Sequence, residues 1–424
     1  MDKKVISYIV LISIVLSLVL LPFLGCTKAT APVKTKPDKI VLHAVGDLSG
    51  LYGRLSAPLT LGWADAIEWY NQQGGVQGVP LDLVYRDTGG KLDQTMAGYA
   101  AMMESSPRPI VVMTFVSADS EALRDRVIED KVVGYAIGGT SKAIYPAGYT
   151  IGIKNGYSDE FGAFTDWVTG DWANKTGVKP VVAILAWEGS FGRAIMTPET
   201  KKYAADKGLE IVAEEYFPPL YTVVNTQLTK LKATRANWIY AQCIVHGIAA
   251  VTKGAKAMDM LPNDPYDTSK IHVFTTCPAL DESAATLAGE AFTGLVGCRN
   301  FVSFAETDNK GVQLISSIFE AKGSDPNAKN GGYLSAWATI PTLGAALNRV
   351  VETDGWDGLK DGSALRREML KTKDFSPVDL TLYTLTPEKP EPIHTRIMYV
   401  KEGGRILPIT PDYITCPDLK PVQQ

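Results

Sequence analysis

The chain has 424 residues, of which 46% are hydrophobic and 21% charged, and its formal net charge is −4. These values are typical of soluble globular proteins and exclude a disordered chain, a fibrous rod and a protein with many membrane spans. No basic block supplies the localised positive field that nucleic-acid binding requires, so we expect a small molecule or a protein as the partner.

The amino-terminal segment departs from this average and is typical of an export signal. Two lysines precede an uncharged apolar run from Val5 to Leu24. The run ends in Phe23-Leu24-Gly25-Cys26, which resembles a bacterial lipobox but lacks the usual residues two and three positions before the cysteine. We predict a signal peptide over 1–25, lipidation of Cys26 and a tether over 26–38. A plain signal peptide and an uncleaved membrane anchor are the alternatives. The protein is therefore expected to be exported, either periplasmic or on the cell surface, with a lipid anchor to the membrane.

After the tether, strands and helices alternate in the order of a parallel sheet that is covered by helices. Short apolar runs predict the strands, and an apolar stripe at helical spacing predicts each helix. Asp93 is expected to be the N-cap of its helix. Strands are predicted at 39–45, 81–85, 109–115 and 132–137, and helices at 58–71, 93–103 and 118–130.

A second run of the same kind follows, so we predict two α/β lobes with a cleft between them. In parallel sheets, ligands bind outside the carboxyl ends of the strands. A third stretch adds terminal elements to the two lobes. The expected strands are 181–187, 210–216, 238–243, 272–276, 295–298 and 396–400, and the expected helices are 193–208, 226–233 and 333–350.

Several short motifs stand in a fixed order from about Lys39 to Val350. They are Gly46-Asp47-Leu48-Ser49-Gly50, the series Asn71, Gly74-Gly75-Val76, Gly78, Leu81 and Asp87, then Ser190-Phe191-Gly192, the stretch from Tyr216-Phe217-Pro218-Pro219 to Gln227-Leu228-Thr229-Lys230-Leu231-Lys232, and Leu287-Ala288-Gly289-Glu290-Ala291 with Gly294. In order and spacing this series resembles the extracellular solute-binding proteins of ABC transporters, specifically the branched-chain amino acid (Leu/Ile/Val-type) family.

The resemblance implies an α/β fold of the type I periplasmic binding proteins, with two Rossmann-like lobes whose parallel-sheet cores are joined by a three-crossover hinge. The lobes are expected to close on a small ligand that an ABC permease then receives. It implies a monomeric binding protein without a cofactor, not an enzyme. The crossovers are expected near Asn155, Phe301 and 379–386, with lobe 1 at 39–154 and 302–380 and lobe 2 at 155–301 and 381–424.

In lobe 1, the resemblance places ligand-binding groups in two loops that follow strands. Ser117 follows one strand, and Gly138 and Thr140 follow the next, where N–H groups and hydroxyls could hold an anionic group. The alternative is that Ser117 only caps the helix that begins at Ala118. Tyr52 and Arg54 lie in a further loop, where a tyrosine could stack on a ligand and an arginine could pair with a carboxylate.

In lobe 2, the chain departs from the family pattern. Phe191 replaces a tyrosine, Ile244 stands near the position of an aromatic residue, and Cys277 stands near the position of the glutamate that pairs with a ligand ammonium. Trp187, at the end of a strand, is either a stacking platform or part of the core. Because a buried ammonium without a partner is costly, we expect an apolar or aromatic carboxylate or an amide in preference to a free α-amino acid.

Other functions receive less support from the sequence. A ligand-sensing receptor uses the same lobes, and an exported α/β hydrolase needs a nucleophile motif that we do not find. The four histidines show no metal-ligand spacing. Cysteines 243, 277, 298 and 416 allow three pairings; Cys243–Cys277 is the first choice, and buried free thiols are the equal alternative.

Overall fold

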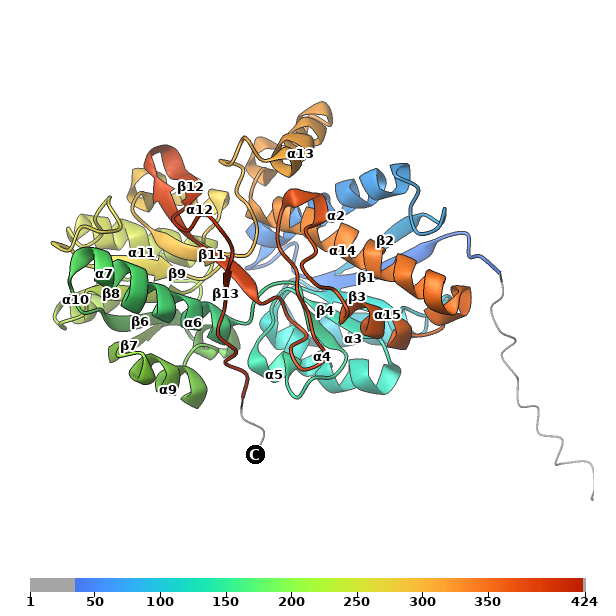
Figure 1. Ribbon diagram of the computed structural model, residues 1–424, viewed down its shortest axis with the longest axis horizontal. Coiled ribbons are helices and arrows are strands. Elements are labelled where there is room, and N and C mark those ends of the chain that lie inside the picture. The colour runs from blue at the N-terminus through green and yellow to red at the C-terminus, as the bar shows by residue number, and fades with distance from the viewer. Residues whose placement is uncertain (1–34, 422–424) are drawn as a thin grey trace, which may run out of the picture. The chain divides into compact units, whose positions relative to one another are not determined.

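The computed structural model describes residues 35–421, coloured along the chain in Figure 1. The predicted signal peptide over 1–25, Cys26 and the tether as far as residue 34 lie outside the described residues, so cleavage and lipidation stay predictions. Among the described residues, no helix is long and apolar enough to cross a membrane.

The first sheet consists of parallel strands in the order β2-β1-β3-β4-β5. The central strands β3 and β4 are buried along their whole length, which explains why their sequences are continuous apolar runs without alternation. The short strand β5 was not predicted, because three residues carry too little periodicity. The strands are β1 Ile40–Gly46, β2 Leu81–Asp87, β3 Val111–Thr114, β4 Val133–Ala136 and β5 Thr150–Gly152.

Helices from two distant parts of the chain pack with this first sheet. The long helix α14, from the third stretch, lies against α2 (Figure 1), and the hydroxyl of Tyr333 on α14 donates to Asp65 on α2 at 2.6 Å. The first lobe is thus completed by residues more than two hundred positions away. Its helices are α2 Gly53–Gln72, α3 Leu92–Met103, α4 Ser117–Asp130, α5 Ser141–Ile144, α13 Lys310–Ala321, α14 Gly331–Asp354 and α15 Ser363–Met369.

The second sheet has the order β12-β11-β10-β9-β8-β6-β7, with β13 paired to β11. Strands β6 to β10 are parallel, but β11 runs antiparallel to β10 and β12 antiparallel to β11. This sheet is therefore mixed at one edge, because the chain re-enters it from the opposite direction. Its strands are β6 Val181–Trp187, β7 Glu210–Phe217, β8 Trp238–Gln242, β9 His272–Thr275, β10 Val296–Arg299, β11 His394–Lys401, β12 Arg405–Pro408 and β13 Ile414–Thr415.

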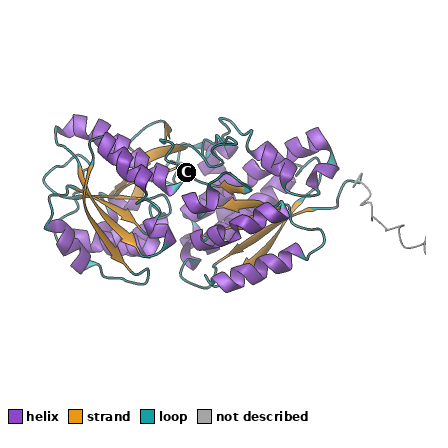
Figure 2. Ribbon diagram, turned by 90° about the horizontal axis from the view of Figure 1, so that it is seen from below, coloured by secondary structure: helices purple, strands orange, loops and turns teal. Residues whose placement is uncertain are grey.

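Helices cover both faces of the second sheet as well (Figure 2). An aromatic cluster fills the space between α6 and the sheet: the ring of Phe164 lies 4.6 Å from that of Phe274 and 5.3 Å from that of Tyr240. The helices of this lobe are α6 Tyr157–Trp167, α7 Ala173–Thr176, α8 Ser190–Arg193, α9 Pro198–Asp206, α10 Asn225–Lys232, α11 Val245–Ala257 and α12 Glu282–Ala288.

Local chemistry explains two differences from the predicted helices. The single helix expected over 193–208 is two helices, because Pro198 starts α9 and Thr197 caps it. The helix α3 begins at Leu92 with Lys91 as its N-cap, so Asp93 lies in the first turn and the prediction of an Asp93 cap was wrong. An acid in the first turn still complements the helix dipole.

The cysteines correct another prediction. All four cysteines of the described residues are free and buried, so the first-choice disulfide Cys243–Cys277 was wrong and the alternative of buried free thiols describes the structure. Burial raises the pKa of the Cys243 thiol well above its usual value. Such a thiol stays neutral and packs as a small apolar group.

The chain passes between the two sheets three times: after β5, after β10 and before β11. The crossing segments touch one another. Phe301 pairs with Thr381 in an isolated bridge, and the hydroxyl of Tyr383 donates to the carbonyl of Ile153 at 2.6 Å. The protein therefore has the predicted α/β architecture of two lobes joined by a three-crossover hinge. The exact lobe boundaries stay a prediction.

Candidate ligand-binding site

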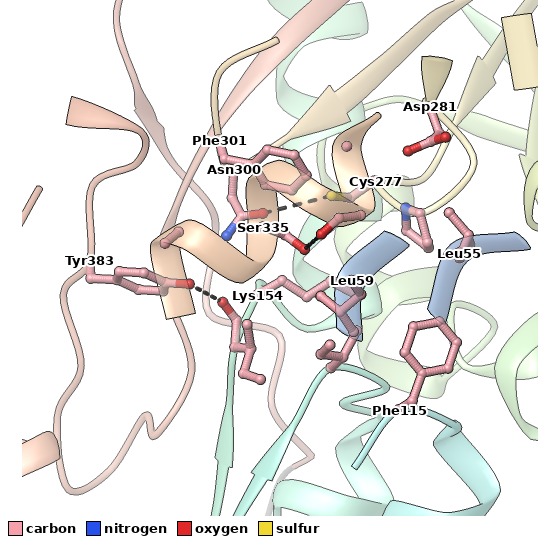
Figure 3. A pocket seen from close by; sticks show the side chains of 16 residues that line it. Leu55, Leu59, Phe115, Lys154, Cys277, Asp281, Asn300, Phe301, Ser335 and Tyr383 are labelled. Atoms are coloured by element: carbon pink, nitrogen blue, oxygen red, sulfur yellow. Dashed lines mark hydrogen bonds between the residues drawn. The ribbon is translucent and has the colours of Figure 1, made fainter. Parts of the chain in front are cut away.

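A cavity of about 60 Å³ lies beside the three crossing segments (Figure 3). At roughly 10–15 Å³ for each water-sized group, it holds about four such groups, or one end of a larger ligand. Strand ends of both sheets and two helices of the first lobe build its wall, the arrangement in which open α/β sheets bind ligands. The lining residues are Leu55, Leu59, Phe115, Ile137, Ile153, Lys154, Cys277, Pro278, Asp281, Asn300, Phe301, Gly331, Gly332, Ser335, Ala338 and Tyr383.

Of the residues predicted to bind the ligand, Cys277 lies directly in this wall. Its thiol contacts the side-chain oxygen of Asn300 at 3.7 Å, and its backbone N–H donates to Glu160 at 3.3 Å. Burial raises the pKa of the thiol to about 12. At neutral pH Cys277 is therefore an uncharged group, so it offers a ligand ammonium no counter-charge.

The charged groups next to Cys277 form a buried ion pair. The ammonium of Lys154 lies 3.5 Å from the carboxylate of Glu160 and 3.7 Å above the ring of Tyr157. Burial, the largest single effect, opposes the charged form of Lys154. The charge of Glu160, together with smaller contributions from Tyr157 and nearby cysteines, outweighs it and raises the lysine's pKa. The hydroxyl of Thr276 also donates to Glu160. The pair thus compensates its own charge and leaves the cavity wall close to neutral.

An aromatic row connects the predicted residues of the two lobes. The hydroxyl of Ser117, on α4, lies 3.5 Å from that of Tyr157, at the start of α6. The ring of Tyr157 meets that of Phe191 edge-on at 5.0 Å, and Phe191 in turn packs against Trp187 at 6.2 Å. Trp187 also packs against the ring of His246 at 4.9 Å. The structure therefore brings Ser117, Phe191 and Trp187 together, with Tyr157 as the residue that joins them.

The capping alternative for Ser117 was wrong. The helix α4 begins at Ser117 itself, its N-cap is Val116, and no side chain caps it. The hydroxyl of Ser117 is directed instead toward the second lobe through Tyr157.

Thr140 is buried and its hydroxyl is already engaged. It accepts from the backbone N–H of Ala143 at 3.3 Å, which caps α5, and donates to Glu121 at 2.7 Å. A hydroxyl has only one proton to donate. Thr140 therefore offers a ligand its hydroxyl only when the bond to Glu121 is broken.

The other predicted residues lie around the same row. Tyr52 packs edge-on against Phe115 at 6.1 Å, and both rest against the core of the second lobe. Ile244 is buried as the N-cap residue of α11. Arg54 is exposed, and its charge, together with burial, lowers the pKa of His246. A ligand-binding role for these residues stays a prediction.

Gly138 lies where the two loops of the first lobe touch. A Cβ atom at this position would stand 2.6 Å from the backbone nitrogen of Ser117 and 2.7 Å from the carbonyl oxygen of Phe115. Both neighbours are backbone atoms that cannot rotate away, so only glycine allows this approach.

We therefore expect Gly138→Ala to push the two loops apart. Overpacking of this kind costs roughly 1–3 kcal/mol of unfolding free energy, and urea denaturation measures it. Gly170→Ala is the matched control, because a Cβ there would meet nothing within 4 Å. If both variants are as stable as the wild type, the close approach of the two loops does not constrain position 138.

Sequence reasoning missed several residues of the cavity. Asn300, Ser335 and Tyr383 come from the second crossing, from α14 and from the third crossing, and no local pattern marks them. Lys154 and Glu160 lie on either side of the predicted crossover at Asn155, but the sequence did not predict the strand that precedes Lys154 or the helix that contains Glu160. Only the fold shows that both are buried.

Asp281 caps α12 by accepting from the N–H of Ser283 at 2.8 Å. It also lines the cavity. Burial, and then the charge of Glu282, raise its pKa to about 6. Arg299, fully buried, holds Glu282 with two hydrogen bonds of 3.1 Å.

No group of three or more His, Cys, Asp or Glu in residues 35–421 is arranged to hold a metal ion.

Comparison with known proteins agrees with this architecture. A branched chain amino acid ABC transporter structure from Thermus thermophilus with bound valine has a TM-score of 0.79 at 18% identity, covering 91% of this chain and 98% of that one. A fatty acid ABC transporter substrate-binding protein from Thermomonospora curvata has a TM-score of 0.75 at 17% identity. The match covers 91% of this chain and 95% of that one. A leucine binding protein from Thermotoga maritima has a TM-score of 0.69 at 16% identity. That match covers 89% of this chain and 99% of the other.

At these identities the structural likeness shows the fold. No curated protein sequence matches the chain. The family model described as periplasmic binding protein matches residues 40–401, which include the first sheet, the second sheet as far as β11, and all three crossings. The chain therefore belongs to the periplasmic binding protein family.

Proposed function

We propose that the protein is the substrate-binding component of an ABC importer, which captures a small ligand in the cleft between its lobes and presents it to a membrane permease. The observation that carries this proposal is the position of the cavity. Its wall combines strand ends of both sheets with the three crossing segments. A ligand bound there contacts both lobes at once and so stabilises the closed form.

The size of the cavity supports a hinge mechanism. Tyr52 and Phe115 of the first lobe already rest against the core of the second. A ligand larger than the cavity therefore enters while the lobes are apart, and closure removes it from water. We propose that the protein acts as a binder and not as an enzyme. The thiol in the cavity wall, Cys277, is buried and its pKa is raised, so it is unsuited to nucleophilic attack.

The wall favours a ligand with an apolar or aromatic body. Leu55, Leu59, Phe115 and Phe301 are among its lining residues, and Cys277 is neutral. We propose a carboxylate or an amide as the polar group in preference to a free α-amino acid. We further propose that the protein is exported, acts as a monomer and is anchored to the membrane through lipid at Cys26.

A thermal-shift screen of the exported protein tests the proposal. A ligand that binds only the folded state, at about one hundred times its Kd, adds roughly 2.7 kcal/mol to the unfolding free energy. The panel contains amino acids, aliphatic and aromatic acids, amides and polyamines. We expect the largest shift from an apolar acid or amide. The largest shift from an amino acid would contradict the ligand class, and ester hydrolysis without any shift would contradict the binding function.

A further inference from the structure

Glu121 joins the two lobes at the aromatic row. It lies on α4, one helical turn after Ser117, so the two side chains share one face of the helix. One carboxylate oxygen accepts from the hydroxyl of Thr140 at 2.7 Å. The other accepts at 3.1 Å from Ser190, which is the first residue of α8 in the second lobe and precedes Phe191. The carboxylate therefore stands at the boundary of the cleft.

The charge of Glu121 is only weakly compensated. Among the described residues, its hydrogen-bond partners are two neutral hydroxyls. A carboxylate offers about four lone-pair positions, and two of them are used here. The remaining positions can accept from a donor that arrives with the ligand, such as an amide N–H or an ammonium.

The acids at or next to the cavity wall are committed elsewhere, since Glu160 is paired with Lys154. Asp281 caps α12, also accepts from the Ser283 hydroxyl, and lies in the field of the buried Arg299. Cys277 carries no charge at neutral pH. Glu121 is thus a half-buried acid between the lobes, and a ligand group could neutralise its negative charge.

We infer that Glu121 sets the head-group specificity of the cleft: it accepts a hydrogen bond from a ligand nitrogen and disfavours a ligand carboxylate. This inference rests on the proposed function and changes its ligand class: the amide is kept, the carboxylate becomes the weaker ligand, and an amine is added. A ligand carboxylate next to Thr140 would compete with Glu121 for the hydrogen bond from the threonine hydroxyl. It would also lie close to the like charge of Glu121 and be repelled. An amide or ammonium instead donates to Glu121.

Three probes with the same branched apolar body test this inference: isovalerate, isovaleramide and isoamylamine. Calorimetry gives their Kd values on the wild type, on Glu121→Gln and on the control Glu129→Gln. The Glu121→Gln substitution keeps a side-chain oxygen for Thr140 but removes the charge. Glu129 lies on the same helix, is exposed and pairs with Arg126.

In the wild type, we expect the amide or the amine to bind at least about ten-fold more tightly than isovalerate. Glu121→Gln should reduce that preference at least about ten-fold, equivalent to about 1.4 kcal/mol, and Glu129→Gln should leave it unchanged. Tightest binding of isovalerate, an unchanged preference in Glu121→Gln, or no binding of any probe overturns the inference. If none of the three probes binds but another compound in the thermal-shift screen does, only the inference about Glu121 is contradicted. If no compound in that screen shifts the melting temperature, the proposed function is contradicted as well.

Discussion

Lys154→Met is expected to lower the unfolding free energy by about 3–5 kcal/mol, the usual effect of removing one partner of a buried ion pair. The variant leaves the Glu160 carboxylate in the interior without its ammonium. Lys154 and Glu160 are 7% and 1% exposed, so water cannot solvate the charge that remains. Urea denaturation, followed by tryptophan fluorescence, measures the change.

Two further variants separate charge from packing. In Lys154→Met/Glu160→Gln the interior is uncharged, so most of the lost stability should return. Lys202→Met removes one partner of an exposed pair, Lys202–Asp206, and should change stability by less than about 1 kcal/mol. A single Lys154→Met variant as stable as the wild type would show that the pair contributes nothing to the fold.

Glu391→Gln is expected to flatten the pH dependence of stability between pH 5 and pH 8. Glu391 is buried at the third crossing, where Tyr145 donates to it at 2.8 Å and the ammonium of Lys389 lies 3.7 Å away. That ammonium is also bonded to Asp159. One cation therefore serves two buried carboxyl groups.

Burial, and then the charge of Asp159, raise the pKa of Glu391 to about 7. Its folded pKa thus exceeds the unfolded one, and the folded protein keeps the proton longer. The resulting stability is fully present below about pH 4.5 and is lost as the pH rises through about 7. The contribution of Glu391 to the unfolding free energy therefore falls by about 2–3 kcal/mol between pH 5 and pH 8.

Urea denaturation at the two pH values checks this prediction. The wild type should lose about 2–3 kcal/mol more than Glu391→Gln on going from pH 5 to pH 8. Glu388→Gln, an exposed residue of the same segment, is the control and should retain the wild-type slope. An identical slope in all three proteins would mean that Glu391 is ionised throughout this range.

Much of the fold follows from local patterns. Strands such as β6 and helices such as α3 were predicted because a buried element displays its apolar periodicity within a few residues. The antiparallel direction of β11 was not predicted, since the direction of a strand depends on the path of the connection that precedes it. The cysteines illustrate the same limit, because their pairing depends on distances across the sheet and not on spacing in the sequence.

The residues of the candidate site also fall into two groups: those expected from the sequence and those that only the structure shows. The loops around Ser117, Gly138 and Phe191 were expected from the family resemblance, and each lies after a strand of one of the two sheets. Glu121 was missed because its position in the middle of a helix looks like an ordinary solvated surface. Only the approach of Thr140 and Ser190 shows that its carboxylate joins two lobes.

By itself, the sequence predicted two α/β lobes with a cleft between them, because the periodicities of strands and helices extend over only a few residues. The pocket residues, Cys277 among them, were expected only from the family resemblance. The tertiary structure alone decided that Lys154 and Glu160 are buried together and that α14 completes the first lobe. It also decided that the hydroxyl of Thr140 is taken by Glu121. The physical reason is that charge compensation and hydrogen-bond satisfaction depend on atoms brought together by folding, often from segments more than one hundred residues apart.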